Sequence, residues 1–395
     1  MVTRCQGYGR GFSIAIACLL LSVLLAMAQE SGKPPIKLGG VIGVNYVYGS
    51  YDEPHPRGTD IGRAELELFR LNADLDYQNF IGRVEYRWYN DSSNYSMFHT
   101  AWLGYDLGDS GTLKAGIVRV PFGPTAYGVS SSWFFDQHFY VGLADDMDLG
   151  ISWHRASGRL TLDAGYYPSS EFRGKGSSFE SARYAYDVVR KQNEVEEGFE
   201  EQHQFNLRAI YTLESGTEIG GSLQYGLLQG TNIEGDDSGA HHALSAHMKN
   251  AFGGFTLYSQ LTYYVYDITD GTPWGTGDLI YMGAYNYADL VASEGIIPAV
   301  SLRYGGFDTS AVSWLDSVTP YVEWSSIMKQ ADGFNDSQLA TVGAAWTIGA
   351  LYVYSDLALS DGNYFVGFDS AGGDFGANED DSWNWRINFN FRYYF

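Results

Sequence analysis

Three charged residues in the first quarter of the chain occupy every second position. Arg83, Glu85 and Arg87 alternate with apolar and aromatic residues in the stretch IGRVEYRWYN. Period-two alternation is typical of a β-strand, because successive side chains point to opposite faces of a sheet. The three charges therefore share one face. There they either guide ions through a channel or brace a wall as an ion-pair network.

The C-terminal segment SWNWRINFNFRYYF has the same period. Aromatic and aliphatic residues occupy every second position up to Phe395, and Arg386 and Arg392 lie on the other face among asparagines. Such a strand must bury its apolar face against a second sheet or against lipid. The same parity argument places Arg208, in QHQFNLRAIYTL, on a polar face with neighbouring amides.

No pattern in the sequence indicates catalysis or a metal site. On a strand, His241 and His247 of AHHALSAH lie about 20 Å apart, which is too far for one ion to bridge. Asp145, Asp146 and Asp148 could offer oxygen ligands to calcium, but they lack the spacing of an EF-hand loop. The nucleophile motif G-x-S-x-G is absent. We therefore expect no enzyme activity, no metal and no cofactor.

The charged residues belong to a long succession of short alternating segments. We predict strands at 36–48, 62–77, 80–90, 95–107, 111–120, 147–156, 159–167, 202–213, 216–229, 240–250, 254–267, 296–305, 318–329, 338–348, 350–359 and 383–395. This total of about sixteen is even, as bacterial single-chain barrels require. In GRAELELFRLNADLDY the apolar positions change parity, which predicts either a β-bulge near Phe69 and Arg70 or a misplaced boundary.

The connections between these strands alternate in length. Short turns are predicted at 77–80, 107–112, 156–159, 213–217 and 347–350, and long loops at 49–61, 91–94, 121–146, 168–201, 230–239, 268–295, 330–337 and 360–382. The connection at 305–319 breaks the rule, because it is long where a short turn is expected. Membrane barrels keep short turns at the periplasmic end and long loops at the external end, so the pattern predicts an all-β transmembrane barrel.

Composition and charge agree with this prediction. The chain has 395 residues, including 48 Gly and 31 Tyr, and a formal net charge of −23. Glycine and aromatic residues suit strands and turns. The acidic balance argues against nucleic acid as a partner. The acids crowd into predicted long loops such as NEVEEGFEE and ANEDDS.

The first 28 residues have the features of a signal peptide. Arg4 and Arg10 precede an apolar core at 12–26, and Ala26-Met27-Ala28 fits a cleavage site. A lipoprotein signal at Cys18 is the alternative. Both cysteines lie in this segment, which excludes a disulfide framework or a zinc–thiolate site from the remaining residues, 29–395. We expect those residues to form one barrel domain.

Two segments resemble parts of Gram-negative outer-membrane porins. The aromatic strand that ends at Phe395 resembles the terminal signature that the barrel-assembly machinery reads. The stretch GTLKAGIVRVPFGPTAYG resembles the phosphate-selective porin O/P type, in which G-x-x-x-V-P-F-G leads from a strand into an inward-folded third loop. The matching residues are Gly116, Val120, Pro121, Phe122 and Gly123.

The resemblance implies a homotrimeric, water-filled channel in the outer membrane, surrounded by lipid and lipopolysaccharide. Small hydrophilic solutes or ions would diffuse through it, with anions such as phosphate among the candidates. The seven lysines and the acidic balance depart from the phosphate-selective members. The alternatives are a plugged barrel that acts as an enzyme or adhesin through its external loops, and a soluble secreted β protein.

The resemblance also implies that about 121–147 is a constriction loop. Its notable residues are Trp133, Phe134, Phe135, Asp136, Asp145 and Asp146. The aromatic residues either anchor the loop to the inner wall or form a stacking surface for sugars, and the acids are expected to face arginines across the lumen. The predicted pore-lining residues are Arg83, Glu85, Arg87, Arg119, Arg208, Arg386 and Arg392. Arg119 is included because the resemblance turns it inward, although its parity matches that of Leu113 and Ile117.

Overall fold

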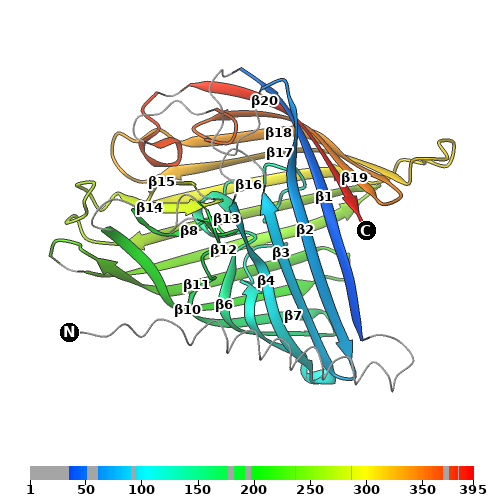
Figure 1. Cartoon of the computed structure of the whole chain (residues 1–395), viewed down its shortest axis with the longest axis horizontal. Coiled ribbons are helices and arrows are strands. Elements are labelled where there is room, and N and C mark those ends of the chain that lie inside the picture. The colour runs from blue at the N-terminus through cyan, green and yellow to red at the C-terminus, as the bar shows by residue number, and fades with distance from the viewer. Residues whose placement is uncertain are drawn as a thin grey trace, which may run out of the picture.

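Most of the chain is described by a computed structural model (Figure 1). The described residues are 35–50, 61–89, 95–176, 182–191, 197–235, 237–285, 287–367, 373–380 and 382–395. The predicted signal peptide and the Cys18 alternative lie outside these residues. Among the described residues, no helix is long and apolar enough to cross a membrane.

Sixteen long strands form one antiparallel sheet that closes on itself. They are β1 (Ile36–Gly49), β2 (Ala64–Tyr77), β3 (Phe80–Tyr89), β4 (Tyr95–Asp106), β5 (Thr112–Arg119), β6 (Met147–Ser157), β7 (Leu160–Ser170), β10 (Glu197–Thr212), β11 (Glu218–Thr231), β12 (Ser238–Phe252), β13 (Phe255–Asp267), β16 (Glu294–Tyr304), β17 (Ser317–Lys329), β18 (Ser337–Ile348), β19 (Leu351–Asp361) and β20 (Trp383–Tyr394). Each pairs with the next of the sixteen, and β1 pairs with β20, with Val41 opposite Tyr394. Closure leaves the barrel without a free edge.

All sixteen predicted strands are confirmed, with boundaries that differ by a few residues. The change of parity in β2 is also real, but it occurs slightly earlier than predicted. Gly43 pairs with Leu68 and Val44 pairs with Leu66, so Glu67 is the extra residue of a bulge. The connection between β16 and β17 is a genuine long connection at the end where the other described turns are short.

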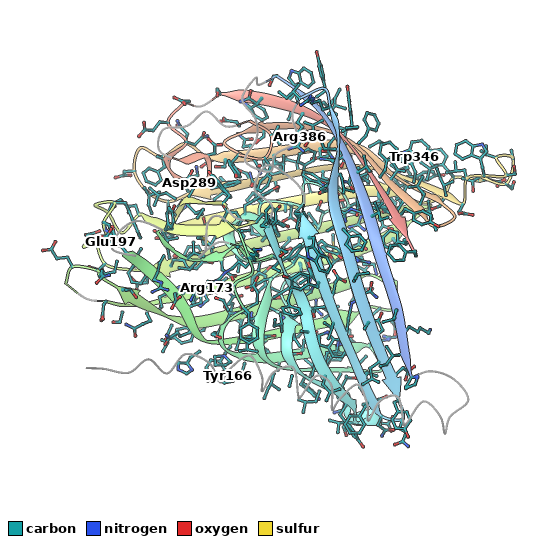
Figure 2. The ribbon with its side chains drawn as sticks, in the orientation of Figure 1. Tyr166, Arg173, Glu197, Asp289, Trp346 and Arg386 are labelled. Carbon is teal, nitrogen blue, oxygen red and sulfur yellow. The ribbon has the colours of Figure 1, made fainter. Side chains whose placement is uncertain are left out.

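The barrel has an apolar outer face and a polar inner face. Leu244 and Leu261, in the middle of neighbouring strands, are 58% and 55% exposed. Asn388 and Asn390 of β20 are fully buried, because they point inward. Figure 2 marks Tyr166, an exposed aromatic residue of β7, and the buried Arg386. This inside-out distribution is that of a membrane barrel.

Several segments from the long-loop end fold into the barrel. They include β8 (Asp187–Val188), β14 (Leu279–Ala284) and β15 (Tyr287–Ala292), which form a three-stranded sheet. The short β9 (Arg190–Lys191) pairs with β10 and belongs to the barrel sheet. The helical turns η2 (Phe139–Val141) and η3 (Gly373–Ala377) are buried among these segments, whereas η1 (Gly108–Ser110) lies in the short turn between β4 and β5. Tyr140 stacks on Phe375 with ring centroids 4.8 Å apart, and both belong to one buried cluster with Met282. The lumen is therefore partly filled at this end.

An arginine-lined cavity in the barrel lumen

The connection from 120 to 146 crosses the inside of the barrel. Near its start, the Gly123 amide donates to Ser222 Oγ of β11 at 3.1 Å. Further along, the Trp133 amide donates to Asp356 Oδ2 of β19 at 3.0 Å. Because these strands lie in distant parts of the ring, the segment spans the lumen.

A carboxylate and an arginine of neighbouring strands hold the middle of this segment. Glu323 of β17 accepts hydrogen bonds from Ser130 Oγ, at 2.7 Å, and from the Ser131 amide. Arg303 of β16 donates to the carbonyls of Val129 and Ser130, at 2.9 and 3.3 Å. Charge-assisted hydrogen bonds of this kind are stronger than neutral ones, so they fix the segment against the inner wall.

The aromatic residues of the segment also contact the wall. The guanidinium of Arg386 lies 4.8 Å from the ring centre of Trp133 and 5.3 Å from that of Phe134, which are cation–π distances. Phe135 stacks on Phe139 within the segment, with centroids 4.3 Å apart. These contacts favour the anchoring interpretation over a sugar-stacking surface.

The three acids of the segment have different partners, so the expectation that all of them face arginines is wrong. Asp136 accepts hydrogen bonds from the amides of Val129 and His138, at 2.7 and 2.9 Å, and thus stabilises its own loop. Asp145 does pair with an arginine, Arg119, at 2.6 Å. Asp146 has no arginine or lysine partner among the described residues. Burial raises its pKa well above the usual range, and repulsion by neighbouring carboxylates adds to the shift.

Arg119 lies on the inner side despite its parity. Leu113 is exposed whereas Ile117 is buried, so the face changes between them. Gly116 makes this change possible, because its φ is +129° and a Cβ there would lie 2.2 Å from the Ala101 carbonyl oxygen. Parity alone could not have shown the change. The structure thus agrees with the inward orientation that the family resemblance implied.

Glu85 is the centre of an ion-pair network on the inner wall. It contacts Arg83 and Arg87 at 2.7 Å each, and Arg70 of β2 at 3.7 Å. Asp74 forms a second ion pair with Arg83, at 2.7 Å. Glu85 is only 2% exposed. Three cations thus share one buried carboxylate, and the network leaves positive charge directed toward the lumen.

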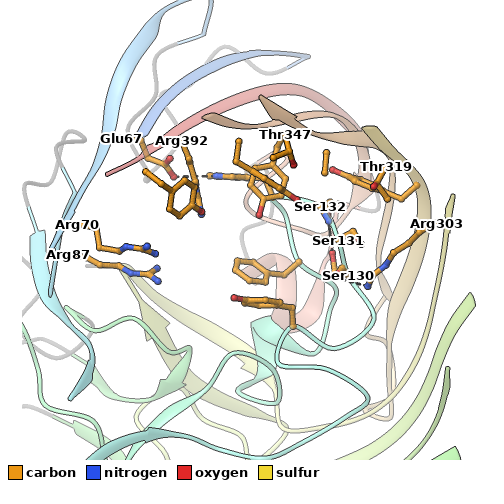
Figure 3. Close-up of a pocket in the computed structure, with 18 of the residues that line it drawn as sticks. Glu67, Arg70, Arg87, Ser130, Ser131, Ser132, Arg303, Thr319, Thr347 and Arg392 are labelled. Carbon is orange, nitrogen blue, oxygen red and sulfur yellow. Dashed lines mark hydrogen bonds between the residues drawn. The ribbon is translucent and has the colours of Figure 1, made fainter. Parts of the chain in front are cut away.

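This positive charge borders a cavity of about 420 Å³ beside the crossing segment. Its charged lining residues are Glu67, Arg70, Arg87, Arg303 and Arg392. Figure 3 shows Arg70 and Arg87 side by side on one wall and Arg303 on the facing wall. Tyrosines, Trp133 and Ser130 to Ser132 complete the lining. The charged lining thus consists of four arginines and one glutamate.

The other predicted pore residues lie inside the barrel but away from this cavity. Arg83 and Arg119 line a second cavity of about 220 Å³. Arg208 pairs with Asp163 at 2.9 Å. Arg386 is 2% exposed and donates to the Phe365 carbonyl at 2.9 Å. It is therefore covered by inward-folded segments, and the expectation that it lines an open pore is wrong.

Three charged residues of the cavity, Glu67, Arg70 and Arg303, are not among the residues predicted from the sequence. Glu67 is the bulged residue of β2 and Arg70 lies just beyond it, where the parity rule fails. Arg303 was recognisable, because it shares parity with Ser301, which is fully buried in the inner face. An inward arginine could have been predicted there from the period of β16 alone.

The closed barrel with an inward-crossing segment defines a fold class, that of the outer-membrane porins. The sequence itself matches no protein-family model and no curated protein. The channel DcaP of Acinetobacter baumannii is similar in structure, with a TM-score of 0.57 and 11% identity, over 91% of this chain and 97% of that one.

Two further solved structures have the same fold. The anion-selective porin of Comamonas acidovorans has a TM-score of 0.55 and 11% identity, over 91% of this chain and 99% of that one. The trimer form of OmpT, an outer-membrane protein of Vibrio cholerae, has a TM-score of 0.55 and 14% identity, with the same coverage of 91% and 99%. At these identities the likeness establishes the fold.

Proposed function

We propose that the chain forms an outer-membrane channel through which small hydrophilic anions diffuse passively. The observation that carries the proposal is the arginine-lined cavity. Positively charged side chains that face a water-filled constriction attract anions and repel cations. The anion-selective porin of Comamonas acidovorans, which has the same fold, supports the proposed sign of selectivity.

The pore-lining residues of this proposal are Arg70, Arg87, Arg303 and Arg392, with Glu67 as the counter-charge. Guanidinium groups are planar and always charged, and they bind oxyanions through paired N–H donors. Inorganic phosphate and small carboxylates are therefore the solutes that this lining suits. The segment from 120 to 146 acts as the constriction, because its contacts hold it across the lumen.

We expect the barrel to insert into the outer membrane because its outer face is apolar. The apolar belt of the strands meets lipid, and lipopolysaccharide surrounds the long-loop end outside the cell. The proposed signal peptide directs export, and the strand ending at Phe395 is presented to the barrel-assembly machinery. We include a homotrimer in the proposal, supported by the trimer form of OmpT.

The test is the reversal potential of purified protein in a planar lipid bilayer with a KCl gradient across it. The proposal predicts a reversal potential of the sign that chloride permeation gives, and current steps in groups of three if the trimer inserts intact. A reversal potential of the opposite sign would overturn anion selectivity. Competition by phosphate on the chloride current then tests the oxyanion preference.

A plugged barrel that acts through its long-loop end is the second candidate. The packing of inward segments favours it, since Tyr140, Phe375 and Met282 meet in one buried cluster inside the barrel. This candidate predicts a correctly folded protein that carries no current. The same bilayer recording therefore separates the two functions.

A further inference from the structure

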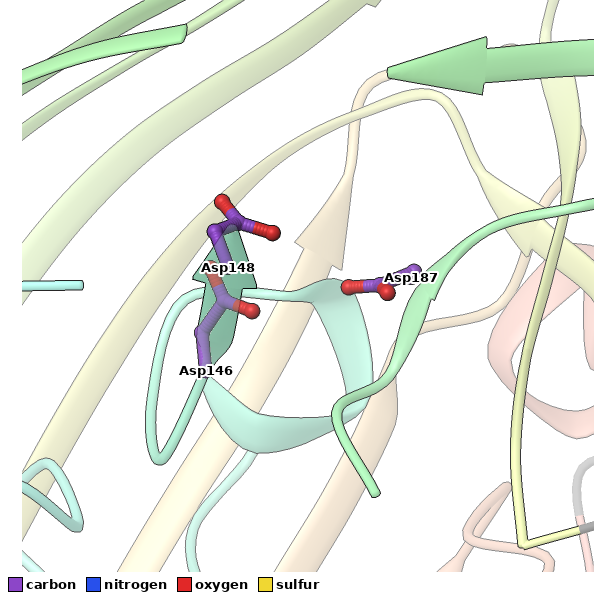
Figure 4. A group of neighbouring side chains, drawn as sticks. All are labelled: Asp146, Asp148 and Asp187. Atoms are coloured by element: carbon purple, nitrogen blue, oxygen red, sulfur yellow. The ribbon is translucent and has the colours of Figure 1, made fainter. Parts of the chain in front are cut away.

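A compact group of carboxylates lies at the long-loop end, apart from the arginine-lined cavity. Asp146 immediately precedes β6, Asp148 is in β6 and Asp187 is in β8. One carboxylate oxygen from each lies within 4.8 Å of the others. Figure 4 shows the three side chains gathered from two parts of the chain. None of the three residues is more than 5% exposed.

The charge around this group is poorly balanced. A neighbouring cavity of about 270 Å³ has three further acids in its lining, Glu171, Glu200 and Glu201, and two arginines, Arg173 and Arg183. Arg183 contacts Asp187 at 2.7 Å and Glu171 at 3.9 Å. Glu200 pairs with Arg190 at 3.4 Å, and no other ion pair with an arginine or lysine is found for the remaining five acids among the described residues. Burying carboxylates without counter-charge costs free energy, so a further positive charge would stabilise this group.

A second observation points to a missing partner. Asp146 Oδ1 and Asp148 Oδ1 are buried and have no hydrogen-bond partner within the described part of the chain. The amide of Gln204, from β10, adjoins them, because its Nε2 donates to Asp148 Oδ2 at 2.9 Å. Its Oε1 is also buried without a partner, and Gln204 is only 2% exposed. Three unsatisfied oxygen acceptors are thus found in and beside one acidic group.

We propose that Asp146, Asp148 and Asp187 bind a divalent metal ion, with Ca²⁺ preferred over Mg²⁺. Ca²⁺ accepts six to eight oxygen ligands at about 2.3–2.6 Å, including amide oxygens, in flexible geometry. Mg²⁺ requires about 2.0–2.1 Å and near-ideal octahedral geometry. The carboxylate oxygens lie within 4.8 Å of one another, a spread that suits the larger ion. The ion supplies the charge that Arg183 alone does not.

Such an ion would connect three parts of the molecule. Asp146 ends the crossing segment, Asp148 belongs to the barrel wall and Asp187 belongs to the inward three-stranded sheet. The metal would therefore fasten the crossing segment and the inward sheet to the wall. This role is independent of which solute passes through the lumen.

The experiment measures Ca²⁺ binding to the full-length, detergent-folded protein after EDTA treatment and dialysis. Isothermal titration with CaCl₂ should reveal a site that competes with terbium, whose luminescence is sensitised by nearby Tyr184 and Tyr186. We expect Asp187→Asn to weaken this site by about tenfold or more, because it removes one charged ligand. MgCl₂ should displace terbium less effectively than CaCl₂.

Asp332→Asn is the matched control, because Asp332 is an exposed acid of another long loop. It should leave the terbium signal and the calcium affinity unchanged. Asp187 lies outside the sixteen barrel strands, so its variant should fold, and heat-modifiable migration in gels verifies this. If Asp187→Asn misfolds, Asp146→Asn provides the same comparison from the other segment. Calcium binding that is equal in these variants and the control, or absent from the native protein, would overturn the proposal.

Discussion

Replacing Arg303 by glutamine should reduce anion selectivity by a measurable factor. Arg303 lies on the wall facing Arg70 and Arg87, so its charge acts on any ion inside the cavity (Figure 3). It has no carboxylate partner among the ion pairs of the described residues. Its removal therefore lowers the positive potential without leaving a partnered acid unpaired.

The size of the change in selectivity depends on the distance between the Arg303 charge and the permeating ion. At about 8 Å in water, one unit charge changes the energy of a monovalent ion by about 0.5 kcal/mol. Anion and cation shift in opposite directions, so their relative energy changes by about 1 kcal/mol and the permeability ratio by about fivefold. A cavity less polar than bulk water would enlarge this change.

The assay is the chloride-to-potassium permeability ratio, obtained from reversal potentials in a planar bilayer. Arg303→Lys keeps the charge and should keep most of the selectivity. Arg159→Gln is the second control, because Arg159 is paired with Glu214 on an exposed short turn. The reasoning is refuted if Arg303→Gln leaves the ratio unchanged, or if it changes the ratio no more than Arg303→Lys does.

Three further predictions concern stability and pore size. Glu85→Gln should destabilise the barrel by about 3–5 kcal/mol, because it leaves a buried cluster of arginines uncompensated. Urea unfolding in detergent should detect this loss, whereas Glu218→Gln, which breaks a partly exposed pair with a lysine, should cost less than about 1 kcal/mol. Leu244→Arg, on the outer face at mid-strand, should cost about 2–4 kcal/mol in lipid bilayers, against about 0–1 kcal/mol for Leu213→Arg near a turn. Equal costs for the two leucine variants would contradict the assigned lipid belt. Trp133→Ala should increase single-channel conductance, because Trp133 borders the cavity, and an unchanged conductance would place the narrowest point elsewhere.

The barrel could be predicted from the sequence because lipid imposes a simple rule on each strand. A residue such as Leu244 must be apolar where it faces lipid, whereas the neighbouring Ser245 faces inward and is free to be polar. The alternation survives even in the last strand up to Phe395. Strand positions therefore followed from period two, and their even number agrees with the rule for bacterial single-chain barrels.

The inner surface was harder to predict, because no rule of comparable simplicity governs it. The bulge at Glu67 and the positive φ at Gly116 each change which residues point inward. Asp136 satisfies amides of its own loop, a local contact that composition does not reveal. Arg386 contacts Trp133 and Phe134, which are far from it in sequence, so its burial depends on tertiary packing.

The most direct test of the proposed function is single-channel recording of the native protein. Purified, heat-modifiable protein should give discrete current steps in a planar bilayer, and the reversal potential in a KCl gradient should have the sign of chloride permeation. A folded barrel that inserts without conducting, or one that prefers potassium, would contradict the account of an anion channel.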